Sequence, residues 1–438
     1  MVTLEKVEAG AAAARAMTRL SRGIKDDALR LLALRLRERA AEIYEANEAD
    51  VASARASGAS EAILSRLAYD GKKLEESIAM IDAVARLPDP SGRTLESRRL
   101  DDGLVLRRVS CPIGLVALIF ESRPDALVQM AALAVKSGDA IIVKGGREAE
   151  RTNRVLADAL SAAGVEAGLP EGWLGSLETR DEVAELLALD RLVDLVIPRG
   201  SNEFVRRIIE TSRIPVLGHA GGVCHVYVHG DADLAMAARL VVDSKAQYPA
   251  ACNAAEVLLV DEASARSALP ELVGALEGAG VALELCPQSM AVVGPGPTRT
   301  LKDDDDWSVE YLSLRMAVRV VGSLDDAIAH INRYGSGHTD AIVCSSDEAA
   351  ARFMAEVDSA SVYRNASTRF ADGYRYGLGA EVGISTGKLH ARGPMGLEGL
   401  QTYKWLLEGE GHIVSEYSSG ARRFVHEDLP VGKGGVRG

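Results

Sequence analysis

The sequence predicts an α/β protein with parallel, doubly wound sheets and more than one domain. The first observation is length, since 438 residues exceed what one hydrophobic core supports. The second is composition, because 47% apolar and 26% charged residues are ordinary for a globular protein and exclude a disordered or collagen-like chain. The third is an alternation of short β-branched runs with helical stretches along most of the chain.

The elements are expected in the following order. The first 90 residues indicate helices, because apolar side chains such as Leu29, Leu32 and Leu36 recur every three or four positions, and Pro88 and Pro90 end this region. The first alternating series has strands at 115–120, 140–143, 193–197 and 223–228, with helices at 125–136, 149–162 and 180–189. The second series has strands at 257–260, 291–293, 317–321, 341–343 and 361–364. The end of the chain, 422–438, is expected to be a loose tail.

Charge and hydropathy exclude several classes of function. The chain has 50 lysines and arginines against 63 acidic residues, a net charge of −13, and only 4% aromatic residues. This balance argues against nucleic acid and anionic membranes as partners. The sequence has no apolar run long enough to span a bilayer and does not start like a secretory signal. The five cysteines lack metal-ligand spacing, so we expect a cytoplasmic protein with reduced thiols and no metal.

Cys252 is the one cysteine in a chemically suggestive position. It follows a helix at 234–245 and Pro249, and it lies in a turn of small residues before the strand at 257–260. Backbone N–H groups of such a turn, including those of Cys252 and Asn253, favour a thiolate and can hold an oxyanion. A buried structural cysteine is the alternative, and we adopt that interpretation for Cys111, Cys224, Cys286 and Cys344.

Both standard nucleotide fingerprints are missing from the sequence. The third glycine after Gly377 and Gly379 comes one place late, and the segment 383–388 has too few residues between its glycines for a phosphate loop. A nucleotide cofactor would therefore have to bind its phosphates in a less usual way.

Several sequence blocks resemble a known family. They lie at 111–114, 120–124, 197–200, 218–220, 244–256, 330–340, 365–370 and 383–394. In this order they are similar to the gamma-glutamyl phosphate reductases, a branch of the aldehyde dehydrogenase superfamily. The resemblance implies an atypical Rossmann cofactor domain, an α/β catalytic domain carrying Cys252, and a small β oligomerisation arm. We accordingly expect N-terminal helices and the cofactor domain at 1–225 with arm strands near 100–112, a catalytic domain at 226–395, the arm at 396–416 and a tail at 417–438.

The same resemblance implies an NADPH cofactor and its contacts. Gly200 and Ser201 match the strand-turn-helix that holds the pyrophosphate. Lys144 matches a lysine that contacts the adenosine ribose, and Glu310 a glutamate that holds the nicotinamide ribose. A plain turn or surface position is the alternative for each of them. Arg147 is expected to meet a 2′-phosphate.

Two positions depart from the pattern of the superfamily. Hydrolytic members carry a glutamate that activates water before two glycines, and His219 stands in that place here. Phosphate is then the natural acyl acceptor or leaving group, while His219 either handles phosphate or a proton, or simply packs against the glycines. Ser122 stands where an asparagine often serves the oxyanion, and Arg123 is a hypothetical partner of the leaving phosphate.

The resemblance implies reduction of L-glutamyl 5-phosphate by NADPH to L-glutamate 5-semialdehyde. Phosphate would leave as Cys252 becomes thioacylated, in the second step of proline biosynthesis from glutamate. Asn365 is expected to contact the substrate. A hydrolytic aldehyde dehydrogenase on the same fold stays open as the alternative. The expected partners are the acyl phosphate and further copies of the chain, since 402–414 reads as a strand-turn-strand suited to pairing. Contact with a separate glutamate kinase is left open.

Overall fold

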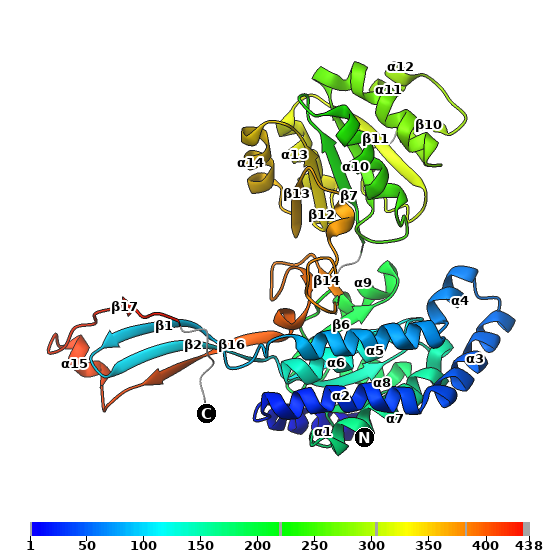
Figure 1. Ribbon diagram of the computed structural model, residues 1–438. Helices are drawn as coiled ribbons and strands as arrows, with labels where there is room; N and C mark the ends of the chain where they lie inside the picture. The colour runs from blue at the N-terminus through cyan, green and yellow to red at the C-terminus, as the bar shows by residue number, and fades with distance from the viewer. Residues whose placement is uncertain (1, 219–220, 303–304, 382, 432–438) are drawn as a thin grey trace. The chain divides into compact units, whose positions relative to one another are not determined.

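The chain folds into two compact units in the computed structural model, which describes residues 2–218, 221–302, 305–381 and 383–431. The first unit comprises residues 1–216 and 396–438, and the second comprises 217–395 (Figure 1). The expected boundary after residue 225 would cut strand β7 (Cys224–Val228). That strand lies inside the sheet of the second unit, which is why the division falls earlier in the chain.

Helices form the start of the first unit, as the apolar periodicity predicts. Leu29, Leu32 and Leu36 of helix α2 are fully buried, so the predicted stripe is the face that packs. The helices of this unit are α1 (Val2–Met17), α2 (Arg22–Glu38), α3 (Ala40–Ala56), α4 (Glu61–Leu67), α5 (Gly71–Arg86), α6 (Pro124–Ser137), α7 (Glu150–Glu166), α8 (Arg180–Leu186), α9 (Asn202–Thr211) and α15 (Val414–Ser418), with short 3₁₀ turns η1 (Arg147–Ala149) and η3 (Leu397–Leu400).

A parallel sheet forms the core of the first unit, with strand order β5-β4-β3-β6. Its strands are β3 (Leu115–Phe120), β4 (Ala140–Lys144), β5 (Leu174–Ser176) and β6 (Leu195–Arg199). The central strands are buried throughout, and apolar up to Lys144 at the end of β4, because helices cover the sheet. Gly10 of α1 lies so close to Leu115 and Ile142 that an added methyl group would overlap their side chains.

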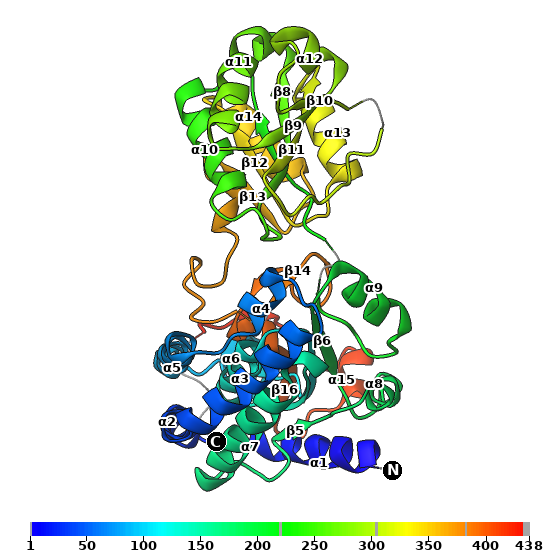
Figure 2. The same ribbon diagram turned by 90° about the vertical axis from the view of Figure 1, so that its right-hand side faces the viewer.

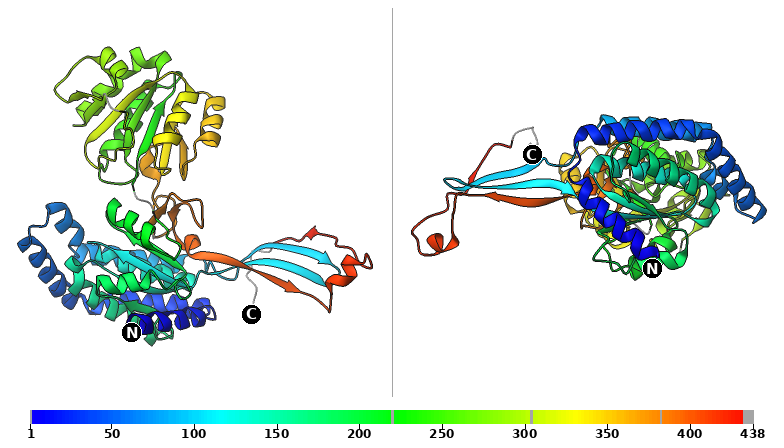
Figure 3. Two further views of the ribbon diagram at one scale, coloured as in Figure 1. Left: turned by 180° about the vertical axis from the view of Figure 1, so that it is seen from behind. Right: turned by 90° about the horizontal axis from the view of Figure 1, so that it is seen from below.

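An antiparallel sheet extends from this unit as an arm, in the order β16-β2-β1-β17 (Figure 3). Its strands are β1 (Thr94–Asp101), β2 (Leu104–Pro112), β16 (Gln401–Glu408) and β17 (Glu427–Asp428). The strand-turn-strand expected at 402–414 is wrong in its second half, since β16 pairs with β2 and the chain continues into α15. The expected loose tail is also wrong at residues 425–429, because β17 and its neighbours pair with β1.

The second unit is a parallel sheet covered by helices on both faces, with strand order β10-β9-β11-β8-β7-β12-β13 (Figure 2). Helices α10 and α11 pack against one face, and α13 and α14 against the other. The remaining elements are β8 (Ala255–Asp261), β9 (Ala282–Leu285), β10 (Arg299–Leu301), β11 (Arg315–Val321), β12 (Thr339–Val343), β13 (Ser361–Arg364), β14 (Gly383–Ser385), β15 (Gly393–Met395), α10 (Leu234–Ala246), α11 (Glu262–Gly278), α12 (Pro287–Val293), α13 (Leu324–Tyr334), α14 (Asp347–Glu356) and η2 (Thr368–Phe370).

One predicted strand of the second unit is a helix. Residues 291–293 form the last turn of α12 because that helix is initiated upstream. Pro287 occupies its first turn, and the sulfur of Cys286 caps it by accepting from the N–H of Ser289. Across the described ranges, no helix is both long and apolar enough to cross a membrane.

Candidate active site

Cys252 lies on the tight turn that joins α10 to β8. Helix α10 ends at Ala246, and the segment between it and β8 consists of turns and bends. The N–H of Ala254 donates to the carbonyl of Ala251 at 2.9 Å, which closes the turn around the cysteine. Cys224, Cys286 and Cys344 are buried, as expected, whereas Cys252 is partly exposed. The buried position expected for Cys111 is wrong, since this residue of strand β2 in the arm is partly exposed too. The thiol of Cys224 donates to the Cys252 carbonyl at 3.3 Å and so holds the turn from beneath.

A buried imidazole contacts the Cys252 sulfur. Nε2 of His338 lies 3.2 Å from Sγ of Cys252, and Nδ1 of His338 lies 2.8 Å from Oγ1 of Thr339. His338 has no solvent-exposed surface and directly precedes strand β12. Sequence reasoning missed this residue as a site member. It falls within the block 330–340, but no local pattern marks it as a partner of a cysteine 86 positions away.

An arginine adds positive charge on the same side of the second unit. Arg369 is buried, its Nε donates to Oε1 of Gln247 at 2.9 Å, and its guanidinium lies 5.8 Å from the centre of the Tyr248 ring. Burial lowers the pKa of Arg369, and the charge of Cys252 acts in the opposite direction. The guanidinium and the cysteine sulfur are therefore electrostatically coupled.

Glu310 and Gly222 lie against the cysteine turn. Oε1 of Glu310 accepts a hydrogen bond from the N–H of Gly222 at 2.8 Å. A methyl group on Gly222 would lie 1.8 Å from the Cys252 carbonyl oxygen, so only glycine fits there. The predicted ribose ligand is thus next to the predicted nucleophile within one unit.

A buried ion pair supports this segment from behind. Nζ of Lys245 donates to Oε2 of Glu256 at 2.5 Å, and both side chains are fully buried. Oε1 of Glu256 accepts from the N–H of Leu312, two residues after Glu310, at 3.3 Å. Burial raises the pKa of Glu256 to about 7 and lowers the pKa of Lys245. The pair therefore connects the helix before Cys252 to the segment that carries Glu310.

Two predicted residues of this unit use their side chains for structure. The Asn253 amide donates to the carbonyl of Ala371 at 2.8 Å, which holds the loop after η2. Asn365 binds both backbone groups of Cys344, at 3.0 Å to the N–H and 2.9 Å to the carbonyl. Both ends of the Asn365 amide are thus bonded to backbone, and a contact between Asn365 and the substrate stays a prediction. His219 lies outside the described residues.

One predicted cofactor residue of the first unit, Arg147, lines a small cavity, and Lys144 lies close to it in the sequence. Lys144 ends β4 and is buried, which lowers its pKa. Arg147 begins η1 and lines the cavity together with Gly145, Asn153 and Arg154. Asn153 is 7% exposed, and neither polar atom of its side chain has a hydrogen-bond partner among the described residues. An unsatisfied amide beside a cavity fits a ligand that offers hydrogen-bonding groups.

The predicted phosphate turn at Gly200 and Ser201 carries a carboxylate of the chain itself. Oε2 of Glu121 accepts from the N–H of Ser201 at 3.1 Å at the start of helix α9. A methyl group on Gly200 would lie 2.5 Å from that oxygen. The N–H of Ser201 is thus engaged by Glu121, and pyrophosphate binding at Gly200 and Ser201 stays a prediction.

Ser122 and Arg123 are both engaged within the first unit. The backbone N–H and the hydroxyl of Ser122 donate to Oε1 of Glu148 at 2.6 and 2.8 Å, with Ser122 at φ 48°. The Arg123 guanidinium pairs with Asp125 in the first turn of α6 at 3.3 Å. Arg123 thus forms an ion pair at the start of α6, and a contact between Arg123 and the leaving phosphate stays a prediction.

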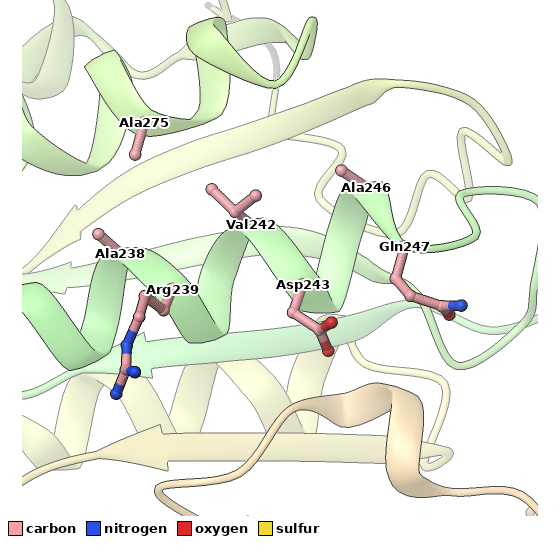
Figure 4. Close-up of a pocket in the computed structure, with 7 residues that line it drawn as sticks. All are labelled: Ala238, Arg239, Val242, Asp243, Ala246, Gln247 and Ala275. Carbon is pink, nitrogen blue, oxygen red and sulfur yellow. The ribbon is translucent and has the colours of Figure 1, made fainter.

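A separate shallow depression lies on the outer side of helix α10 (Figure 4). Ala238, Val242 and Ala246 of α10 and Ala275 of α11 form its apolar floor. None of the residues that line it is a predicted site residue. Gln247, the partner of Arg369, also lines it, so the depression adjoins the segment that carries Cys252.

Known proteins resemble this chain along most of its length. The model of the aldehyde dehydrogenase family matches residues 4–295. A gamma-glutamyl phosphate reductase of Pelotomaculum thermopropionicum is 52% identical over 406 residues, covering 93% of each chain. The crystal structure of a gamma-glutamyl phosphate reductase from Thermotoga maritima has a TM-score of 0.91 at 39% identity, covering 94% of this chain and 99% of that one. An acetylating aldehyde dehydrogenase from Geobacillus thermoglucosidasius shares the fold, with a TM-score of 0.63 at 18% identity over 94% of this chain and 97% of that one. The chain belongs to the aldehyde dehydrogenase family and, within it, to the gamma-glutamyl phosphate reductases.

Proposed function

We propose that this protein reduces L-glutamyl 5-phosphate to L-glutamate 5-semialdehyde and releases inorganic phosphate, using NADPH. The observation that carries the proposal is Cys252, a partly exposed thiol that contacts an imidazole and is electrostatically coupled to a guanidinium, in a chain about half identical to gamma-glutamyl phosphate reductases. The similarity to gamma-glutamyl phosphate reductases also supports a place for this protein in proline biosynthesis.

The chain's own residues account for the covalent part of this reaction. The Cys252 sulfur attacks the δ-carbonyl, and backbone N–H groups of its turn face the oxygen that becomes negative. Phosphate leaves and a thioacyl group stays on the sulfur. A bound reduced nicotinamide supplies the hydride that converts this group to the aldehyde. Glu310, held next to the cysteine turn through Gly222, orients the ribose that carries the nicotinamide.

The residues of the first unit fit a phosphorylated dinucleotide. The turn at Gly200 and Ser201 already binds a carboxylate oxygen, and the cavity beside Arg147 presents the unsatisfied amide of Asn153. Arg147 is exposed beside this cavity and supports a ligand with an extra phosphate, NADPH over NADH, whereas Arg154 there pairs with Glu150 and Glu178. Replacing Arg147 with Ala should raise the KM for NADPH at least tenfold and leave that for NADH unchanged. Equal effects on both cofactors would reject this role.

The decisive assay measures NADP⁺ reduction with pyrroline carboxylate/semialdehyde, with and without phosphate. Wild-type protein should require phosphate, and Cys252→Ala should lose activity by several orders of magnitude. Phosphate-independent reduction would instead identify the hydrolytic aldehyde dehydrogenase that the sequence leaves as the alternative.

We also propose that copies of the chain associate through the arm. Strand β16 is at one edge of the arm sheet, and Tyr403, Trp405 and Leu407 along it are each about half exposed. An apolar edge strand is a surface on which a further strand can pair. A Trp405→Lys variant should sediment as a smaller species than the wild-type protein, and unchanged sedimentation would contradict the assignment.

A further inference from the structure

His338 bridges the Cys252 sulfur and a hydroxyl. Its Nε2 lies 3.2 Å from Sγ, and its Nδ1 lies 2.8 Å from Oγ1 of Thr339. The two ring nitrogens therefore have different partners, which fixes the plane of the ring. With Nδ1–H donating to Thr339, the lone pair of Nε2 points to the sulfur, and this is the tautomer that can accept a proton from it.

The other buried imidazoles of this unit are placed differently. Nδ1 of His225 lies 2.9 Å from Oδ1 of Asp340, whose other oxygen accepts from the Ser359 hydroxyl. His330 packs against His225, and burial lowers the pKa of His330 to about 2, so this ring stays neutral. Asp340 is thus committed to His225, although it lies only two residues after His338.

We propose that His338 is a catalytic residue that takes the proton of the Cys252 thiol before the sulfur attacks, so that the resting site is an imidazolium–thiolate pair. This inference rests on the proposed function for the identity of the substrate, but the proton transfer itself requires only the two side chains. Arg369 contributes a second positive charge that favours the thiolate.

The proton and electron pairs balance over the cycle. The S–H proton moves to Nε2, and the sulfur forms a C–S bond to the δ-carbonyl while the C–O bond to phosphate breaks with its pair on oxygen. The thioacyl carbon then accepts the hydride, and the C–S bond breaks with its pair returning to sulfur. The imidazolium is unchanged at the end, and one proton from solvent goes to the released phosphate.

The test is the pH dependence of Cys252 alkylation by iodoacetamide, resolved by peptide mass spectrometry, without substrate or cofactor. A free thiol has a pKa near 8.5 and is only about 1% thiolate at pH 6.5. Wild-type Cys252 should react at pH 6.5 at a rate within severalfold of its rate at pH 9. His338→Gln should lose roughly tenfold to a hundredfold at pH 6.5 and keep its rate at pH 9. His229→Gln, which alters an imidazole at the opposite end of β7, should match the wild type.

Two outcomes would overturn the proposal. One is a wild-type profile that rises only near pH 8.5, and the other is a folded His338→Gln protein with the wild-type profile. A purely structural role would lower the rate equally at all pH values, and it would count against the proposal too. If His338→Gln fails to fold, the wild-type pH profile and the Thr339→Val variant decide instead. Thr339→Val removes the hydroxyl that contacts Nδ1 of His338 at nearly constant volume, so it should lower the alkylation rate at pH 6.5 severalfold. Because no acyl phosphate is present, these outcomes are independent of whether the reductase assay succeeds.

Discussion

Replacing Gly222 with Ala should damage catalysis by displacing the Cys252 backbone. The new methyl carbon would lie 1.8 Å from the Cys252 carbonyl oxygen and 2.8 Å from its Cα. The cysteine turn must therefore retreat by at least about 1 Å, and a misplacement of about 1 Å costs on the order of 100-fold in rate. We expect kcat/KM to fall about 100-fold, equivalent to about 3 kcal/mol of transition-state stabilisation. Overpacking should also cost about 1–3 kcal/mol of folding free energy.

Steady-state NADP⁺ reduction with semialdehyde and phosphate measures the loss of kcat/KM in Gly222→Ala, and thermal unfolding measures the loss of folding free energy. Gly274→Ala in helix α11 is the matched control, because an added methyl group meets nothing within 4 Å there. That variant should keep wild-type turnover and gain up to about 1 kcal/mol of stability. A Gly222→Ala protein with wild-type kcat/KM would refute the argument that the Cys252 carbonyl leaves no space.

Three further predictions concern buried groups. Gly145→Ala places a methyl group 2.0 Å from Nδ2 of Asn153, so it should raise the KM for the cofactor roughly tenfold with little change in kcat, as a cofactor titration would show. Burial raises the pKa of Asp139 to about 7, so the folded protein holds a proton that the unfolded chain has lost between about pH 4 and 7. The free energy of unfolding should therefore fall as pH rises through that window, and urea titrations of Asp139→Asn should lack this slope. Lys245→Met leaves Glu256 without its cation, so it should cost about 3–5 kcal/mol at pH 8 and less at pH 6, where the carboxyl is protonated; equal losses at both pH values would contradict the pairing.

The bounds of a strand could be predicted from the sequence where all of its residues are buried. Strands β3 and β13 have the predicted bounds, and β3 is fully buried, so its apolar run has no competing interpretation. Strand β10 carries the polar residues Arg299 and Thr300 at a sheet edge, which left no apolar run to detect. Residues 291–293 misled because a β-branched run also fits the end of a helix whose start is fixed by Pro287.

The site was predictable only for the residue that the turn marks. Cys252 stands out locally, because small residues and a proline surround it. His338 reaches it from 86 residues away, and Glu121 reaches Ser201 across 80 residues. Such contacts depend on which strands become neighbours in a sheet, and no local periodicity carries that information. Family resemblance supplied Lys144 and Glu310 instead.

The insertion of the second unit into the first has a consequence for synthesis. Strand β2 can pair with β16, its neighbour in the arm, only after the ribosome has made the chain as far as residue 408. The second unit, in contrast, is continuous in sequence and is complete at residue 395. Until β16 has been made, β1 and β2 form a hairpin with both outer edges unpaired, since β17 follows later still, and an isolated hairpin is marginally stable. A chain that stops before residue 401 would therefore keep the whole second unit but expose the β2 edge, so truncation there should cause aggregation even though every strand next to Cys252 is present.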